Sequence, residues 1–231
     1  MKRYIHLLFI LFLLNCDKER IVQLPEIENA KITEVKDVSP AYIFYDETQP
    51  DSTLFNRKNL IGTTNWLVNV DKRLTLKQAI PHIQYLQDKR KKASMHKNED
   101  AKNYFTCNDT SLGSLGFVEF TDVNYIIDIE NYKPVDEAPI DNEIKYVLIH
   151  FFNNDYLNIT EFLSDKQTKD QTLEIDKYFN SDLFTEYRKN KNIINISFDI
   201  RMSFQLYIRL KHKVMDYTNE MSKINNDEFI Y

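Results

Sequence analysis

The sequence VNVDKRLTLKQAI at Val68–Ile80 is echoed later in the chain by ISFDIRMSFQLYI at Ile196–Ile208. Aligned without gaps, the two segments share an Asp-x-Arg motif followed two residues later by a hydroxyl residue; the matched positions are Asp71 and Asp199, Arg73 and Arg201, and Thr75 and Ser203. In each copy a strand-like run precedes the aspartate, and apolar residues at helical spacing follow the hydroxyl residue. We therefore expect an α/β (α+β) fold of two small strand-helix-strand-helix modules. The match is short and degenerate, so an internal repeat and chance similarity both stay open.

The composition is that of a globular protein with unusually little glycine. Of 231 residues, 42% are hydrophobic and 28% charged, and the 15 Phe and 14 Tyr argue against a disordered chain. With only 3 Gly, the sequence contains no glycine-rich phosphate-binding motif and no G-x-S-x-G nucleophile elbow. A formal net charge of -5 disfavours a nucleic-acid partner, because nucleic-acid-binding domains are strongly basic.

The N-terminus predicts the compartment. Lys2 and Arg3 precede the apolar run Ile5–Leu14, which is too short to span a bilayer, since a spanning helix needs about 20 residues. The run ends in Leu-Leu-Asn-Cys, which resembles the lipobox of bacterial lipoproteins, with Asn where Gly, Ala or Ser is usual. We expect residues 1–15 to be a signal peptide, and an acylated Cys16 to anchor the protein to a bacterial envelope membrane. A plain signal peptide, or an uncleaved anchor with an incidental cysteine, is the alternative.

The remaining chain divides into modules and connecting segments. Prolines and charged residues predict a tether at 16–40, a first α/β module at 41–132, a linker at 133–143 and a second α/β module at 144–231. Strands are predicted at Ala41–Glu47, Asn65–Val70, Leu115–Ile129, Ile144–Asn154 and Asn192–Ile200. Helices are predicted from Thr75, near Thr172–Phe179, and from Ser203 to about Ile224. Thr75 and Gln78 have the spacing of a capping box, and Pro81 predicts a kink or a late start of the first helix.

The second half, roughly Ile144–Glu220, resembles a known family. The stretch INISFDIRMSFQLYIRLKHKVMDYTNEM is similar to the C-terminal strand and helix of the ExbD/TolR family, in the form seen in Bacteroidota-type bacteria. In that family the strand ends in Asp-Arg, a pair that Ile200 separates here. The family's Tyr-Ile and Tyr-Asn-Glu elements correspond to Tyr207-Ile208 and to Tyr217-Thr218-Asn219-Glu220.

The resemblance implies a small α/β domain that dimerises or grips partner proteins. Family members are subunits of proton-driven envelope motors, and each carries a transmembrane helix with an essential aspartate. Here the apolar run Ile5–Leu14 is short and contains no acid, so the resemblance does not extend to the proton path. The first half would be a diverged copy of the same domain.

No catalytic or metal-binding pattern is legible in the sequence. The five histidines are dispersed, and neither H-E-x-x-H nor a Cys/His cluster with zinc spacing occurs. We expect no enzymatic activity, no metal and no cofactor. If Cys16 is acylated, Cys107 has no partner within the chain; a buried free cysteine is the simpler interpretation, and an exposed thiol or an intermolecular link is the alternative.

The candidate interaction or structural residues are Asp71, Arg73, Asp199, Arg201 and Tyr207. An aspartate at a strand end stabilises the start of the following helix, which favours a structural role over a catalytic acid with an anion-binding arginine. We expect an envelope lipoprotein that acts by protein-protein interaction, as an accessory to a proton-driven transport system and without a proton channel. Its partners would be envelope proteins or a second copy of the chain. The alternative is an envelope lipoprotein that binds a small ligand or glycan through its aromatic residues.

Overall fold

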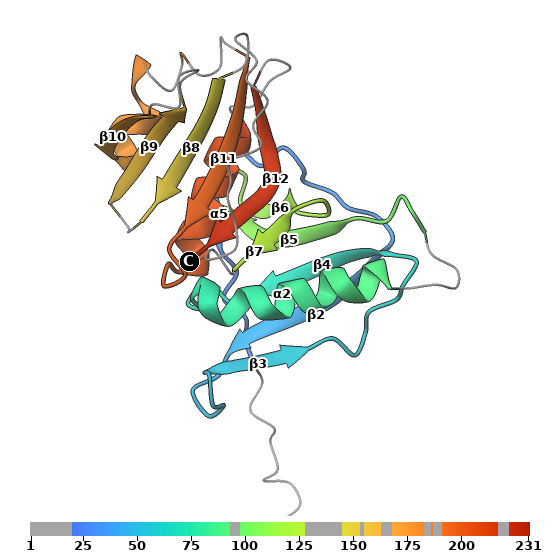
Figure 1. The fold of residues 1–231 in the computed structure, drawn as a ribbon. Coiled ribbons are helices and arrows are strands. Elements are labelled where there is room, and N and C mark those ends of the chain that lie inside the picture. The colour runs from blue at the N-terminus through green and yellow to red at the C-terminus, as the bar shows by residue number, and fades with distance from the viewer. Residues whose placement is uncertain are drawn as a thin grey trace, which may run out of the picture.

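The computed structural model describes residues 20–92, 98–127, 145–152, 155–162, 168–182, 186, 191–216 and 222–231. Cys16, the predicted linker at 133–143 and the Tyr217–Glu220 motif lie outside the described residues. The described chain forms two six-stranded sheets that contain both parallel and antiparallel pairs, with helices packed against them (Figure 1). The α/β mixed class expected from the sequence is therefore confirmed. Within these ranges no helix has the length and apolar character needed to cross a membrane.

The first sheet is built around the parallel strands β2, β4 and β5. It contains β1 (Glu26–Ile27), β2 (Val38–Tyr45), β3 (Thr53–Asn56), β4 (Asn65–Val70), β5 (Asn103–Asp109) and β6 (Ser114–Glu119). The strand order is β1-β5-β4-β2-β3, and β6 also pairs with β5. Helix α2 (Leu76–Lys91) connects β4 to β5 and buries its apolar side, including Ala79, Ile80 and Ile83.

The second sheet is built around the parallel strands β8, β11 and β12. It contains β7 (Asn124–Ile126), β8 (Lys145–Phe151), β9 (Tyr156–Phe162), β10 (Thr168–Glu174), β11 (Asn192–Phe198) and β12 (Ser222–Ile230), in the order β10-β9-β8-β11-β12-β7. The short helix α3 (Ile175–Phe179) follows β10, and α5 (Phe204–Asp216) follows β11.

The two sheets share an order and a set of strand directions. In the first, β2 and β3 form an antiparallel hairpin, and β4 and β5 are added parallel to β2. In the second, β8 and β9 form the hairpin, and β11 and β12 are added parallel to β8. The strand that precedes each hairpin, β1 or β7, lies parallel to β5 or β12. Strand β6, and the pair β10 and α3, have no counterpart in the other sheet.

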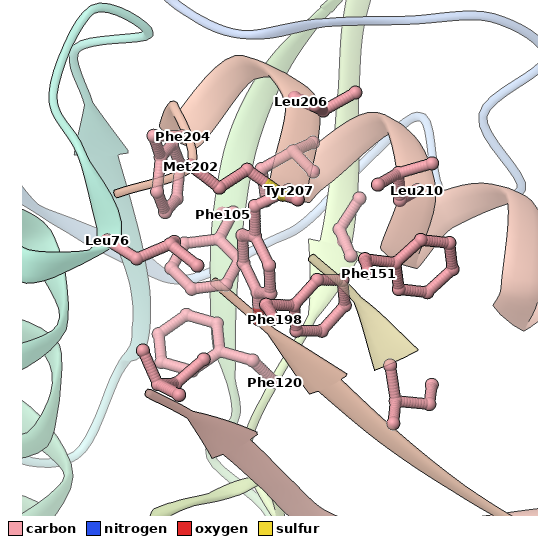
Figure 2. Close-up of a cluster of buried hydrophobic side chains, with 14 of the residues drawn as sticks. Leu76, Phe105, Phe120, Phe151, Phe198, Met202, Phe204, Leu206, Tyr207 and Leu210 are labelled. Atoms are coloured by element: carbon pink, nitrogen blue, oxygen red, sulfur yellow. The ribbon is translucent and has the colours of Figure 1, made fainter. Parts of the chain in front are cut away.

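A hydrophobic core joins the two sheets. Phe105 of β5 stacks on Phe120 with ring centroids 3.9 Å apart and meets Phe204 of α5 edge-on at 5.2 Å. Tyr207 of α5 lies edge-on to Phe198 of β11 at 4.9 Å, and Figure 2 shows these rings in one cluster. Because the buried residues of both halves form one cluster, the two sheets stabilise each other.

The structure corrects the predicted module boundaries. Glu26–Ile27, inside the expected tether at 16–40, form β1, and β2 begins at Val38. Asn124–Ile126 form β7 in the second sheet, although the sequence predicts a first module that extends over 41–132. β1 pairs with β5 and β7 pairs with β12, and this pairing satisfies backbone N–H and C=O groups of the two short strands. The composition of these segments does not reveal that they pair.

Two helix predictions are wrong in extent. Thr172–Glu174 end strand β10, and only Ile175–Phe179 are helical. Helix α5 ends at Asp216 rather than near Ile224. Ser222–Ile224, the last residues of the predicted helix, instead begin strand β12. This strand contains two asparagines and an aspartate, which are poor helix formers, and it pairs parallel to β11.

Candidate functional site

The first Asp-x-Arg motif forms a closed ion pair at the end of β4. Asp71 is fully buried, and its carboxylate accepts hydrogen bonds from Nε and Nη2 of Arg73, each at 2.8 Å. The backbone N–H groups of Arg73 and Gln23 also donate to it, at 3.1 and 3.2 Å. Burial alone would raise the pKa of Asp71, but the hydrogen bonds from Arg73 and Gln23 outweigh it and hold the pKa below its ordinary value.

The second motif has the same geometry at the end of β11. Arg201 donates to the Asp199 carboxylate from Nε at 2.9 Å, from Nη2 at 2.5 Å and from its backbone N–H at 2.8 Å. The hydrogen bond from the Arg201 side chain is the main cause of the lowered pKa of Asp199. The motifs differ in exposure, because 83% of the Arg201 side chain is exposed against 40% for Arg73. The Arg73 guanidinium also lies over the Tyr45 ring, 4.6 Å from its centroid.

The two Asp-x-Arg turns contact each other through their backbones. Thr75 and Ser203, the aligned hydroxyl residues, form an isolated antiparallel bridge. Around it the hydrogen bonds come in matched pairs: Leu76 N–H to Met202 O (2.9 Å) with Phe204 N–H to Leu74 O (2.7 Å), and Lys77 N–H to Ile200 O (2.8 Å) with Gln205 N–H to Lys72 O (3.2 Å). Exchanging the two aligned segments converts each bond into its partner, so the contact is close to two-fold symmetric. The structure thus places the four predicted charged residues in two turns that touch.

These contacts favour a structural role for the motifs. Both carboxylates are occupied by their own arginine and by backbone donors, which leaves them little capacity for proton transfer or metal binding. In the described part of the chain, no group of three or more His, Cys, Asp or Glu residues is arranged to hold a metal ion. Cys107 is a buried free cysteine, and burial raises the pKa of its thiol.

Tyr207, the fifth predicted residue, lies in a separate buried network of polar side chains. Its hydroxyl donates to Glu228 Oε2 at 2.7 Å. The Tyr125 hydroxyl lies 3.0 Å from the Tyr207 hydroxyl and donates to it, because the Tyr207 proton is already engaged. Lys211 forms an ion pair with Glu228 Oε1, and the two side chains are only 4% and 2% exposed. Burial raises the pKa of both tyrosines well above its ordinary value, so both stay protonated.

Sequence reasoning missed Tyr125, Lys211 and Glu228. One signal was available in α5, where Lys211 stands between Tyr207 and Val214 in the apolar stripe of the helix. An apolar residue normally occupies such a position, and a lysine there indicates a buried partner of opposite charge. The partner could not be identified, because Glu228 lies on β12, beyond the end of the predicted helix, where the sequence predicts no strand.

The network adjoins a cavity of about 360 Å³ beside α5 and β12. Its apolar wall comes from Val123, Ile196, Met215 and Ile224, and its charged groups include Lys211 and Glu228. Glu119 lies on β6 of the first sheet and Ile196 on β11 of the second, so both sheets contribute to the cavity. An apolar cavity with a few convergent charged groups is the usual form of a small-molecule site.

Comparison of the sequence with known proteins does not identify a family, so the function has to be inferred from the observations above. No protein-family model matches the sequence, and no curated protein matches it significantly.

Proposed function

We propose that the chain is a membrane-anchored envelope lipoprotein that acts by protein-protein contact, as an accessory to a proton-driven envelope transport system and without proton-channel activity. The lipobox-like sequence that ends at Cys16 supports the anchor. The ExbD/TolR-like stretch of the second half supports the link to such a system. The short apolar run Ile5–Leu14, which has no acid, argues against a proton path.

The observation that carries the proposal is the symmetric contact between two sheets of the same order. The shared strand order and the matched hydrogen bonds around Thr75 and Ser203 support two α/β modules related by an internal repeat. A two-fold contact is self-complementary, and here both complementary surfaces belong to one chain. The two surfaces that form this contact therefore pair with each other within one chain. Binding of a partner protein would use other surfaces of the molecule.

Arg201 is the turn residue best placed for such a partner. Its guanidinium is held by Asp199 and yet 83% of the side chain is exposed, so a partner carboxylate can reach it without reorganising the side chain. Arg73 is less suited, because Tyr45 covers part of its guanidinium.

Crosslinking in intact cells, followed by solubilisation of the membranes and mass spectrometry of what copurifies, tests the proposal. We expect envelope transport subunits to be recovered, and we expect Arg201→Ala to reduce the yield. The matched control is Lys91→Ala, which removes an exposed cation from the end of α2. Recovery of the protein alone, or equal yields from Arg201→Ala and the wild type, contradicts the proposal.

Membrane fractionation tests the anchor separately. We expect Cys16→Ser to lose the acyl chains and to leave the membrane fraction, because acyl chains supply the membrane affinity. Cys107→Ala, which changes a buried thiol, should remain in the membrane fraction. A Cys16→Ser variant that still sediments with membranes would show that another element holds the protein there.

A second candidate function is ligand binding at the envelope, and the cavity beside Lys211 favours it. The two functions are compatible, since Arg201 is not one of the residues that line the cavity.

A further inference from the structure

The buried pair Lys211 and Glu228 needs a reason to exist. Removing two charges from water costs several kcal/mol for each ion, and apolar residues of similar volume are often equally or more stabilising. Stability alone therefore does not account for this pair. A pair that borders a cavity, however, can orient the polar groups that a ligand meets.

The first sheet shows that the same architecture folds without these charges. In the gap-free alignment of the two Asp-x-Arg segments, Tyr207 and Lys211 of α5 correspond to Ala79 and Ile83 of α2. All four side chains are buried. The helix position that carries the buried lysine in the second sheet is thus filled by a plain aliphatic residue in the first.

The strand register extends the comparison to Glu228. Glu228 lies beside Ile196 in the pairing of β12 with β11, as Phe105 lies beside Val68 in the pairing of β5 with β4. Ile196 and Val68 are aligned, so Glu228 corresponds to the buried Phe105. A polar trio in the second sheet therefore stands where the first has Ala, Ile and Phe. Two of its members, Lys211 and Glu228, line the cavity of about 360 Å³, and none of the three aligned residues of the first sheet does.

The register of β12 shifts at this point. Ile224 pairs with Ile194 and Glu228 with Ile196, so three residues of β12 lie opposite Asn195 alone. Asn225 and Asn226, two of the three residues in this bulge, line the cavity. Bulges next to binding sites re-aim side chains in this way.

The chemistry of the occupant follows from which groups already have partners. Glu119 accepts hydrogen bonds from Lys102 at 3.0 Å and from the Thr121 hydroxyl at 3.1 Å. Glu228 accepts from Lys211 and Tyr207. Each glutamate of the cavity is thus matched by a lysine.

Lys223 is the cation left over. Within the ranges that the structure describes, its side chain has no hydrogen bond or ion pair, and it lines the cavity. Lys211 has N–H groups beyond the one that meets Glu228. The cavity therefore has a surplus of donors and one unbalanced positive charge, beside an apolar wall.

We propose that the cavity binds a small organic carboxylate with an apolar body. The carboxylate lies at Lys223 and at the remaining donors of Lys211, and the apolar body packs against Val123, Ile196 and Ile224. This specifies the ligand-binding candidate above. It does not depend on membrane anchoring or on a protein partner, so it can fail while the adaptor proposal stands.

Isothermal titration calorimetry of the purified full-length protein tests it with hexanoate and phenylacetate, and with hexanamide and phenylacetamide as uncharged matches. We expect at least one of the two acids to bind, and its amide to bind at least about tenfold more weakly. Lys223→Gln should weaken binding of the acid about tenfold. The control Lys91→Gln changes an exposed lysine on α2 and should leave binding unchanged.

A second variant separates binding from folding. Lys211→Met combined with Glu228→Leu removes both buried charges together, so we expect it to fold and to lose binding of the acid. Three results would overturn the proposal: neither acid binds at millimolar concentration, an acid and its amide bind equally, or both variants bind the acid as the wild type does.

Discussion

At the scale of single residues, one motif makes one geometry in two environments. The bidentate pairs Asp71 with Arg73 and Asp199 with Arg201 have nearly the same hydrogen bonds. The Asp71 side chain has no exposed surface, whereas 12% of the Asp199 side chain is exposed. A carboxylate that loses its arginine needs water to replace the lost hydrogen bonds, and water can reach the partly exposed Asp199 but not the buried Asp71.

Replacing each arginine should therefore have unequal effects. We expect Arg73→Met to lower the free energy of unfolding by about 2 kcal/mol, because it leaves a buried carboxylate without its charged donor. Arg201→Met should cost clearly less, since solvent takes the place of an arginine that is already mostly exposed. Urea denaturation of both variants at neutral pH measures the difference. Equal losses would contradict the environments described here.

His150 is a half-buried histidine whose environment makes the stability of the fold depend on pH. It lies on β8, where Nδ1 is 3.1 Å from Ser197 Oγ and also contacts the Tyr231 hydroxyl. Burial lowers the pKa of His150 from 6.5 to about 4, although the negative charge of Asp199 opposes the change. The imidazole is therefore neutral in the folded protein at neutral pH.

The lowered pKa sets the direction of the pH dependence. The unfolded chain takes up the proton first as the pH falls, so the contribution of His150 is fully present above pH 6.5 and is lost between pH 6.5 and about 4. We expect His150→Gln to reduce the loss of unfolding free energy over this range. Titration of the His150 ring by NMR measures the pKa directly, and a value near 6.5 would contradict the burial seen here.

At the scale of elements, α2 begins as its sequence predicts but does not break where proline suggests. The Thr75 N–H donates to Gln78 Oε1 at 2.8 Å, which confirms the capping box. The helix begins at Leu76 and continues through Pro81 to Lys91, so the late start is wrong. Pro81 has no N–H to donate to the carbonyl of Lys77, and packing of the apolar side of α2 on the sheet outweighs this loss.

Removing the proline should stabilise the protein. Pro81 is exposed, so Pro81→Ala restores the missing hydrogen bond without leaving a cavity, and we expect unfolding free energy to rise by about 1–3 kcal/mol. Pro81→Gly should give a smaller gain, because glycine costs about 1 kcal/mol in a helix interior. Thermal and urea unfolding provide the measurement. A decrease for Pro81→Ala would show that proline fits the helix better than alanine does.

The elements show why some of the fold is legible in the sequence and some is not. β4 matches its predicted bounds, Asn65–Val70, because Trp66, Val68 and Val70 alternate along it and a capped helix follows soon after. β5 was not predicted, because it begins and ends with asparagine and aspartate after a charged segment, and its three apolar residues do not stand out from this polar surrounding. Strand β12 was not predicted, because its first residues were assigned to the preceding helix, and its pairing with β11 gives it an extended conformation.

At the scale of the whole molecule, the sites depend on segments that are distant in sequence. The Asp-x-Arg turns could be found by alignment, but their mutual contact could not, because nothing in either copy specifies its partner. Tyr125, which precedes the second hairpin, meets Tyr207 and Glu228 only because β7 crosses into the second sheet. Such long-range contacts place the polar network and the cavity beyond the reach of local patterns.

The central claim is that the two Asp-x-Arg turns meet within one chain, and a designed disulfide tests it most directly. Thr75 and Ser203 lie opposite each other, and the hydrogen bonds on either side make them a non-hydrogen-bonded antiparallel pair. Such pairs have Cα atoms about 4.5 Å apart, within the roughly 4.4–6.8 Å that a disulfide requires.

Thr75→Cys combined with Ser203→Cys should close under mild oxidation, and mass spectrometry of the digested monomer should show the peptides that contain the two positions joined. Each single variant is the control and should keep a free thiol. We predict an intramolecular link in a monomeric protein. Links found only between chains, or two thiols that both remain open to alkylation after oxidation, would contradict the internal pairing of the two sheets.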